Sequence, residues 1–154
     1  MFRRLAVALL VVVAGAMLAA PAYGGPATTD TEHFTNVHES DVVPDCNGNG
    51  PFNETFVFNE VTHLTTLASG FHFTATAQGT DTLVPTDPSL PTYTGHFAFW
   101  DGDNVSQQTD IETFTQAEIL KGSDGSKLRF TIVAQTAANP HGTISFAHSN
   151  CVQG

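Results

Sequence analysis

Positive charge is nearly absent from this chain. Its 154 residues include five Lys and Arg residues against 15 Asp and Glu residues. Arg3 and Arg4 lie at the start, and only Lys121, Lys127 and Arg129 follow them. So few scattered cations cannot neutralise a phosphate backbone or an anionic lipid surface. We therefore expect neither nucleic acid nor, once a leader is removed, a membrane among the partners of this protein.

Cysteine is just as scarce. Cys46 and Cys151 are the two cysteines, and they lie near opposite ends of the chain after its apolar start. They do not form a Cys-x-x-Cys motif, and no neighbouring base or cation lowers either pKa, which argues against a redox-active pair. The sequence predicts one structural disulfide, which would contribute about 4 to 5 kcal/mol in the chain-entropy treatment of a loop of about 100 residues.

Long hydrophobic runs are absent beyond residue 20. The one such run, Leu5 to Ala20, follows Arg3 and Arg4 and precedes Pro21. This order is typical of a secretory signal peptide, and the run is shorter than the roughly 20 residues that cross a membrane. We predict a bacterial Sec-type signal peptide over residues 1–24 and one secreted, extracellular domain over 25–154. Three basic residues against 15 acidic ones give that domain a formal charge of −12.

Helical periodicity is also missing, and apolar residues alternate instead with polar ones. Phe71, Phe73, Ala75 and Ala77 share one side of such a segment, which is typical of a half-buried strand. We predict strands at 31–39, 53–61, 62–68, 70–78, 92–100, 107–120, 127–136 and 143–150. Because closure removes exposed edges, we expect an antiparallel up-and-down β-barrel of about eight strands. A two-sheet, jelly-roll-like sandwich is the alternative.

Two dipeptides predict hairpins. Asp124-Gly125 favours a tight turn that sets Ile119 opposite Phe130. Ser69-Gly70 sets Ala68 opposite Phe71 in the same way. Two further segments read as connections: Asp101-Gly102-Asp103-Asn104, which is expected to end a strand at Trp100, and the segment containing Pro85, Pro88 and Pro91.

Several of these features occur in an order that resembles a known group. The features are Thr82-Leu83, Asp87-Pro88-Ser89, the stretch Pro91-Thr92-Tyr93-Thr94-Gly95-His96-Phe97 leading to Trp100, then Gly122-Ser123-Asp124-Gly125-Ser126 and a terminal Cys151. Together they resemble a group of small secreted actinobacterial β proteins. The resemblance implies secretion and a β fold. It implies no chemistry, because its motifs are turns and strands, and the histidines are not part of it.

The sharpest chemical motif is a calcium-like loop. Asp45, Asn47 and Asn49, followed by Gly50, present oxygens in the Asp-x-Asn-x-Asn-Gly pattern of such loops. The pattern then fails, because Phe56 stands where a bidentate Glu is needed. A polar turn is the competing interpretation.

The seven histidines lack the spacing of a metal site. In the predicted hairpin, His63 and His72 share a face but lie about 13 Å apart along the strands. His96 and Trp100 share another face. Together with His72 they are candidates for an aromatic ligand platform, and a satellite apolar cluster is the alternative. No cofactor is predicted.

Catalytic signatures are absent, and we assign no catalytic residue. Gly-x-Ser-x-Gly does not occur. Asp101 with Asp103, or Glu112 with Glu118, could serve acid–base chemistry, although carboxylates on loops and outer faces are more often solvated charge.

The leading hypothesis for function is therefore a non-enzymatic binding or interaction module that takes a small apolar ligand or an extracellular protein. A cell-surface structural protein without a small-molecule site is the first alternative. An extracellular hydrolase or isomerase, with His96 or His72 beside a carboxylate in a pocket, is the second.

Overall fold

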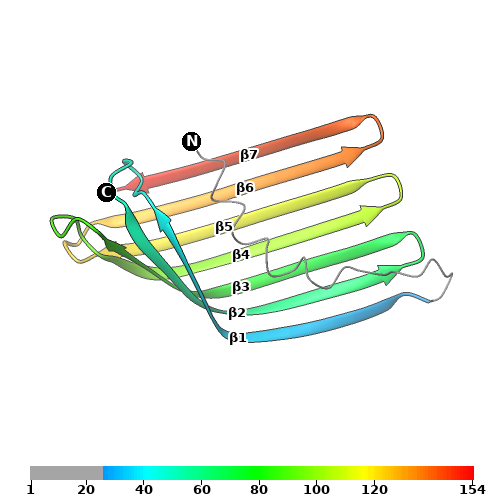
Figure 1. Cartoon of the computed structure of the whole chain (residues 1–154), viewed down its shortest axis with the longest axis horizontal. Helices are drawn as coiled ribbons and strands as arrows, with labels where there is room; N and C mark the ends of the chain where they lie inside the picture. Colours follow the sequence, from blue (N-terminus) through cyan, green and yellow to red (C-terminus); the bar gives the residue numbers. More distant parts are fainter. Residues whose placement is uncertain (1–25) are drawn as a thin grey trace.

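The structure is a computed structural model that describes residues 26–154, so the predicted signal peptide lies outside the described residues. Seven strands form one antiparallel sheet in sequence order (Figure 1). The strands are β1 (Thr28–Val43), β2 (Phe52–Leu67), β3 (Gly70–Pro85), β4 (Tyr93–Ser106), β5 (Asp110–Gly122), β6 (Lys127–Asn139) and β7 (Gly142–Gln153). Within the described residues, no helix is long and apolar enough to cross a membrane.

The predicted all-β, up-and-down antiparallel fold is confirmed, but the sheet has seven strands and is open. The segments predicted as 53–61 and 62–68 form one continuous strand, β2, because no turn residue separates Val61 from Thr62 and both pair with β3. Among the described strands, β1 and β7 each pair with one neighbour and are the two edges of the sheet. The closed barrel and the two-sheet sandwich are therefore not what residues 26–154 form.

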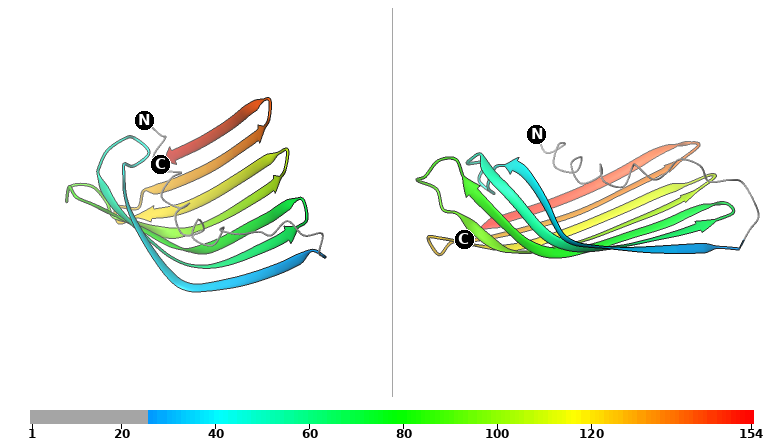
Figure 2. Two further views of the ribbon diagram at one scale, coloured as in Figure 1. Left: turned by 45° about the vertical axis from the view of Figure 1, so that its right-hand side comes forward. Right: turned by 60° about the horizontal axis from the view of Figure 1, so that its bottom comes forward.

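The sheet curls strongly at one end and is flatter at the other (Figure 2). The curled end carries the β1–β2, β3–β4 and β5–β6 connections, and the open end carries the β2–β3, β4–β5 and β6–β7 turns. Two glycines allow the close approach of strands at the curled end. A Cβ on Gly79 would lie 2.2 Å from the carbonyl oxygen of Val57, and one on Gly95 would lie 2.0 Å from that of Ile119. Any side chain at either position would force the neighbouring strand away.

The predicted Cys46–Cys151 disulfide is confirmed, and it joins the two edges of the sheet at the curled end. Cys46 lies in the loop after β1 and Cys151 lies in β7, with their Cα atoms 5.2 Å apart. A hydrogen bond from Asn47 Nδ2 to Gln153 Oε1, at 2.7 Å, lies beside it. The loop thus reaches from the first strand to the last, which keeps the end of the sheet curled.

The strand registers separate the charges between the two faces of the sheet. Every Asp and Glu residue within the strands lies on the concave face. Lys121, Lys127 and Arg129 lie on the convex face, as do the histidines of the strands. The apolar core also lies on the concave face, in two clusters. Phe56, Phe58, Phe97 and Phe99 form the centre of one cluster, and Phe52 and Tyr93 the centre of the other. The concave face is therefore both apolar and acidic.

The hairpin at Asp124-Gly125 exists, but its predicted register is wrong by one residue. Gly122 N–H bonds to Ser126 O, so the turn is longer than two residues and the strands pair from Lys121 with Lys127. A slip of one residue exchanges the two faces of a strand. Ile119 is consequently exposed on the convex face, and Glu118 is buried on the concave face.

The remaining turn and connection predictions have different outcomes. The Ser69-Gly70 hairpin forms with Thr66 opposite Phe71, two residues from the predicted register, so the faces are as expected. The proline-containing segment connects β3 and β4, as predicted. Asp101 to Asn104, however, do not form a turn. They continue β4, because β3 and β5 pair with it on both sides and Gly102 leaves room for the ring of Trp100.

Candidate functional site

A cavity of about 400 Å³ opens on the concave face at the curled end. Its walls come from β1 and the loop after it, β2, β3, β5, β6 and β7. The wall is largely apolar, with Phe56, Leu120, Leu128, Phe130 and Ile132 among its members. All of its ionisable groups are carboxylates, namely Glu39, Asp41, Asp45, Glu54 and Glu118. No Lys, Arg or His residue of the described chain lines it.

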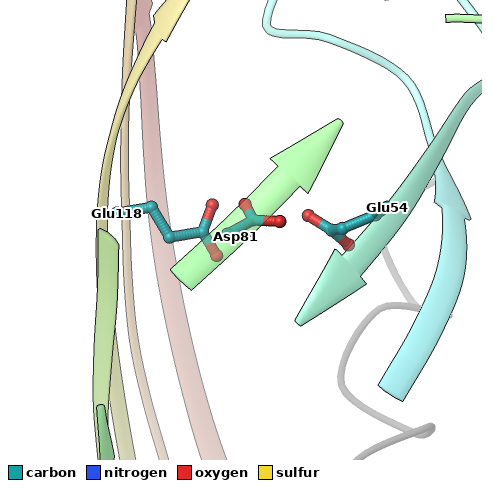
Figure 3. Close-up of side chains that lie close together, drawn as sticks. All are labelled: Glu54, Asp81 and Glu118. Carbon is teal, nitrogen blue, oxygen red and sulfur yellow. The ribbon is translucent and has the colours of Figure 1, made fainter. Parts of the chain in front are cut away.

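Three carboxylates meet beside this cavity, and we call them the carboxylate triad: two of them line the cavity, and Asp81 is buried next to them without lining it. Glu54 comes from β2, Asp81 from β3 and Glu118 from β5, and one oxygen of each lies within 4.8 Å of the others. Figure 3 shows the three groups pointing toward one another. Asp81 and Glu118 are separated by β4, where Gly95 pairs with Asp81 and carries no side chain. The bare backbone at Gly95 leaves the two carboxylates free to approach across that strand.

The triad is buried and short of hydrogen-bond donors. Asp81 is 0 % exposed, and Glu54 and Glu118 are each 6 % exposed. Among residues 26–154, neither carboxylate oxygen of Asp81 has a hydrogen-bond partner. Glu118 accepts one hydrogen bond, from Gln116 Nε2. Buried charges are normally paired or bound to a cation, and the described part of the chain places no Lys, Arg or His residue in the cavity beside the triad.

Burial is the largest influence on the protonation of the triad. Burial, together with the negative charge of neighbouring carboxylates, which are Asp81 and Glu118 for Glu54 and Glu118 for Asp81, raises the pKa of Glu54 to about 9 and that of Asp81 to about 8. Burial also raises the pKa of Glu118 to about 7, against the hydrogen bond from Gln116, which lowers it. Empty, the triad therefore holds protons near neutral pH. A bound cation would displace them, because it stabilises the ionised carboxylates.

The predicted ligand platform lies on the other face of the sheet. His96, Trp100 and His72 all project from the convex face, and none of them lines the cavity. Trp100 packs over Gly102, and the ring of His72 lies 3.2 Å from the carbonyl oxygen of Asp103. The structure thus separates the histidines from the buried carboxylates, and a role for these three residues in binding stays a prediction.

The calcium-like loop has its carboxylate turned inward. Asp45 Oδ1 accepts hydrogen bonds from the backbone N–H groups of Asn47 and Asn49, at 2.9 and 2.8 Å. Asp45 Oδ2 accepts one from Asn49 Nδ2 at 3.0 Å. These bonds are those of a polar turn that positions Cys46 for the disulfide. Calcium binding by Asp45, Asn47 and Asn49 stays a prediction that this geometry does not favour.

Sequence reasoning missed Glu54 and Asp81 and placed Glu118 on the solvent side. The signal was present in the alternation of the strands. Steps of two from Phe73 lead through Ala77 and Gly79 to Asp81. Glu54 lies between Phe52 and Phe56 in the same way, which places a carboxylate in phase with buried side chains.

Comparison of the chain with protein-family models, with curated proteins and with solved structures gives no match. The resemblance to small secreted actinobacterial proteins therefore stays a prediction, and the argument for function rests on the geometry of the cavity.

Proposed function

We propose that this protein is a secreted binding module whose cavity takes a small amphiphilic amine. The apolar body of the ligand would lie against Phe56, Leu120, Phe130 and Ile132, and its ammonium group would lie at the carboxylate triad. The observation that carries the proposal is the composition of the cavity, whose wall is apolar and whose ionisable groups are all carboxylates. An apolar ligand without charge would leave those acids without a partner.

The number of groups in the triad favours an ammonium group over a metal ion. A primary ammonium group has three N–H donors, and Glu54, Asp81 and Glu118 offer one oxygen each within a small volume. Calcium takes six to eight oxygen ligands. Three carboxylates supply six at most, and the rest of the wall is mostly apolar. An ammonium group therefore needs fewer oxygen ligands from this site than a calcium ion does.

The hydrolase or isomerase alternative requires a histidine beside a carboxylate in a pocket. His72 and His96 lie on the convex face, so the cavity does not combine the two groups. Binding without chemical conversion of the ligand is therefore the function that the geometry supports best.

The test is calorimetric titration of the protein with n-octylamine, with n-octanol as the neutral probe of equal length. Alkylammonium groups titrate near pH 10, as that of lysine does, so octylamine stays cationic from pH 6 to pH 8.5. We expect one octylamine per chain, weaker binding of octanol, and an affinity for octylamine that rises with pH. The rise follows because the ammonium group must displace the protons that the triad holds at low pH.

Substitutions in the carboxylate triad test whether octylamine binds there. Glu54→Gln combined with Glu118→Gln should weaken octylamine binding by about tenfold or more, since two charge-assisted hydrogen bonds are lost. Glu32→Gln, on the same face but outside the cavity, is the matched control and should bind as the unaltered protein does.

Three results would contradict the proposal. Equal binding of octanol and octylamine would show that the cavity selects apolar surface alone. Calcium binding that excludes octylamine would assign the triad to a metal ion. No binding of either probe would favour the structural, cell-surface role.

A further inference from the structure

The edge strand β7 is exposed and carries no charge. Residues 142–153 contain no Asp, Glu, Lys, Arg or Pro. Every residue of the strand except Gln153 is exposed, including Ile144 at 78 % and Phe146 at 59 % on the convex face. Long exposed edges of this composition pair readily with another strand, and natural proteins usually cover or block them.

The opposite edge strand, β1, is protected against pairing by its charged residues and by an irregularity in its backbone. It carries Asp30, Glu32, Glu39 and Asp41. Its pairing with β2 is also interrupted by a register shift between Phe34 and Val37, which distorts the edge. β1 is therefore protected against pairing, whereas β7 is not.

The free backbone groups of β7 can be assigned from its pairing with β6. Lys127 and Gly154 exchange both of their backbone hydrogen bonds, and the register then runs without a shift to Asn139 and Gly142. Hydrogen-bonding direction alternates along an antiparallel strand. The even-numbered residues of β7 therefore bond to β6, and Thr143, Ser145 and Ala147 direct their N–H and C=O groups to the open edge.

We propose that β7 is the interface of a symmetric dimer, in which two copies of this chain pair antiparallel through residues 142–148. With the two-fold axis at Ser145, each Ser145 exchanges backbone hydrogen bonds with Ser145 of the partner subunit. Thr143 bonds in the same way to Ala147 of the partner subunit. Ile144 then lies opposite Phe146 of the partner subunit on the convex face, as a pair with closely spaced side chains.

The edge of β7 is self-complementary, since antiparallel pairing about Ser145 sets Ile144 opposite Phe146 of the partner subunit and brings no charged residues together. This favours a second copy as the occupant, and charge then selects β7 as the point of contact. Each copy is strongly acidic, so two copies can approach closely only where no carboxylate lies. Pairing of β1 with β1 of the partner subunit would bring carboxylates together. Pairing of β1 with β7 of the partner subunit would leave one edge of each type open and would build a filament rather than a closed pair.

The convex face supplies an apolar surface for the same contact. Ile111, Ala137 and Ile144 are neighbours in one row across β5, β6 and β7. In the dimer this row continues onto Phe146 of the partner subunit. The proposal does not depend on the ligand of the cavity, which opens on the concave face.

Sedimentation equilibrium of the secreted domain over a range of concentrations tests the proposal. We expect a monomer–dimer equilibrium. Phe146→Lys should raise the dimer dissociation constant by about tenfold or more, because both copies lose a central apolar side chain. Ile119→Lys is the matched control, because Ile119 is also 59 % exposed on the convex face but lies in a central strand. It should leave the dimer intact.

A second pair of variants tests the register. Ser145→Cys places a thiol at the two-fold axis, where the Cα atoms of an antiparallel hydrogen-bonded pair are about 5.5 Å apart, within reach of a disulfide. We expect mild air oxidation to link two copies of this variant. Thr143→Cys, which has Ala147 of the partner subunit opposite it, should remain largely unlinked.

Three results would overturn the proposal. One is a monomer at all concentrations. Another is a dimer that Phe146→Lys leaves unchanged, and the third is growth beyond the dimer. Preferential linking through Thr143→Cys would overturn the pairing at Ser145.

Discussion

The curled end and the open end of the sheet use the same residue types on the concave face but treat their carboxylates differently. At the curled end, burial raises the pKa of Glu54 to about 9 and that of Asp81 to about 8. At the open end, Asp101 and Asp103 follow Phe97 and Phe99 on the same face of β4, yet burial raises the pKa of each only to about 6. Composition is therefore not what sets the environment of a carboxylate here.

The curvature of the sheet causes this difference in the burial of the carboxylates. At the curled end, β1 to β3 face β5 to β7 across the cavity, so a carboxylate on the concave face has protein on both sides (Figure 2). The open end is a single layer, and its carboxylates remain partly accessible to solvent. The disulfide belongs to the curled end, and so does Gly95, whose missing side chain lets Asp81 and Glu118 approach each other, which is why a site can form there and not at the open end.

The strongest way to abolish this difference is to remove the disulfide. Cys46→Ser combined with Cys151→Ser should lower the free energy of unfolding by about 4 to 5 kcal/mol, because the unfolded chain regains the entropy of an open loop. Urea denaturation measures the change. Octylamine binding should fall with it, since the loop after β1 lines the cavity. Octylamine binding equal to that of the unaltered protein would show that the curl persists without the bond.

A smaller change tests which side of β5 faces the cavity. Leu120→Ala should cost about 2 to 5 kcal/mol, since Leu120 is buried at 3 % exposure, whereas Ile119→Ala should cost less than about 0.5 kcal/mol. Thermal unfolding of the two variants provides the measurement. The opposite order would restore the register predicted from Asp124-Gly125.

The pH dependence of stability should also differ between the two ends. The folded triad holds protons that the unfolded chain releases above about pH 4, so the free energy of unfolding of the empty protein should fall as the pH rises from about 4 to 9. Asp81→Asn should flatten this fall between about pH 4 and 8, because the pKa of Asp81 is raised from 3.8 to about 8 in the folded chain. Melting temperatures at several pH values, measured without ligand, provide the test. A stability that rises toward pH 9 would contradict the raised pKa values.

The smallest expected effect lies at the open end. Asp103→Asn should change the pH dependence only below about pH 6 to 7, because the pKa of Asp103 is raised only to about 6. The same series of melting curves measures it. A flattening between about pH 6 and 8 equal to that of Asp81→Asn would mean that the two ends bury their carboxylates alike.

Much of the fold could be predicted because it depends on local pattern. The alternation around Phe71 and Phe73, the connection containing three prolines and the pairing of the only two cysteines all follow from short-range rules. The site could be predicted less well, because it depends on register. The turn at Asp124-Gly125 is longer than the dipeptide suggests, and the resulting slip of one residue moved Glu118 from the solvent side to the cavity.

By itself the sequence determined an acidic, antiparallel, all-β chain with one disulfide, since charge, alternation and cysteine number are properties of the residues and their order. Only the tertiary structure decided that the sheet stays open and curls at one end, and that Glu54, Asp81 and Glu118 meet. Those outcomes depend on which strands pair, on where a glycine lets two of them approach, and on contacts between residues far apart in the chain.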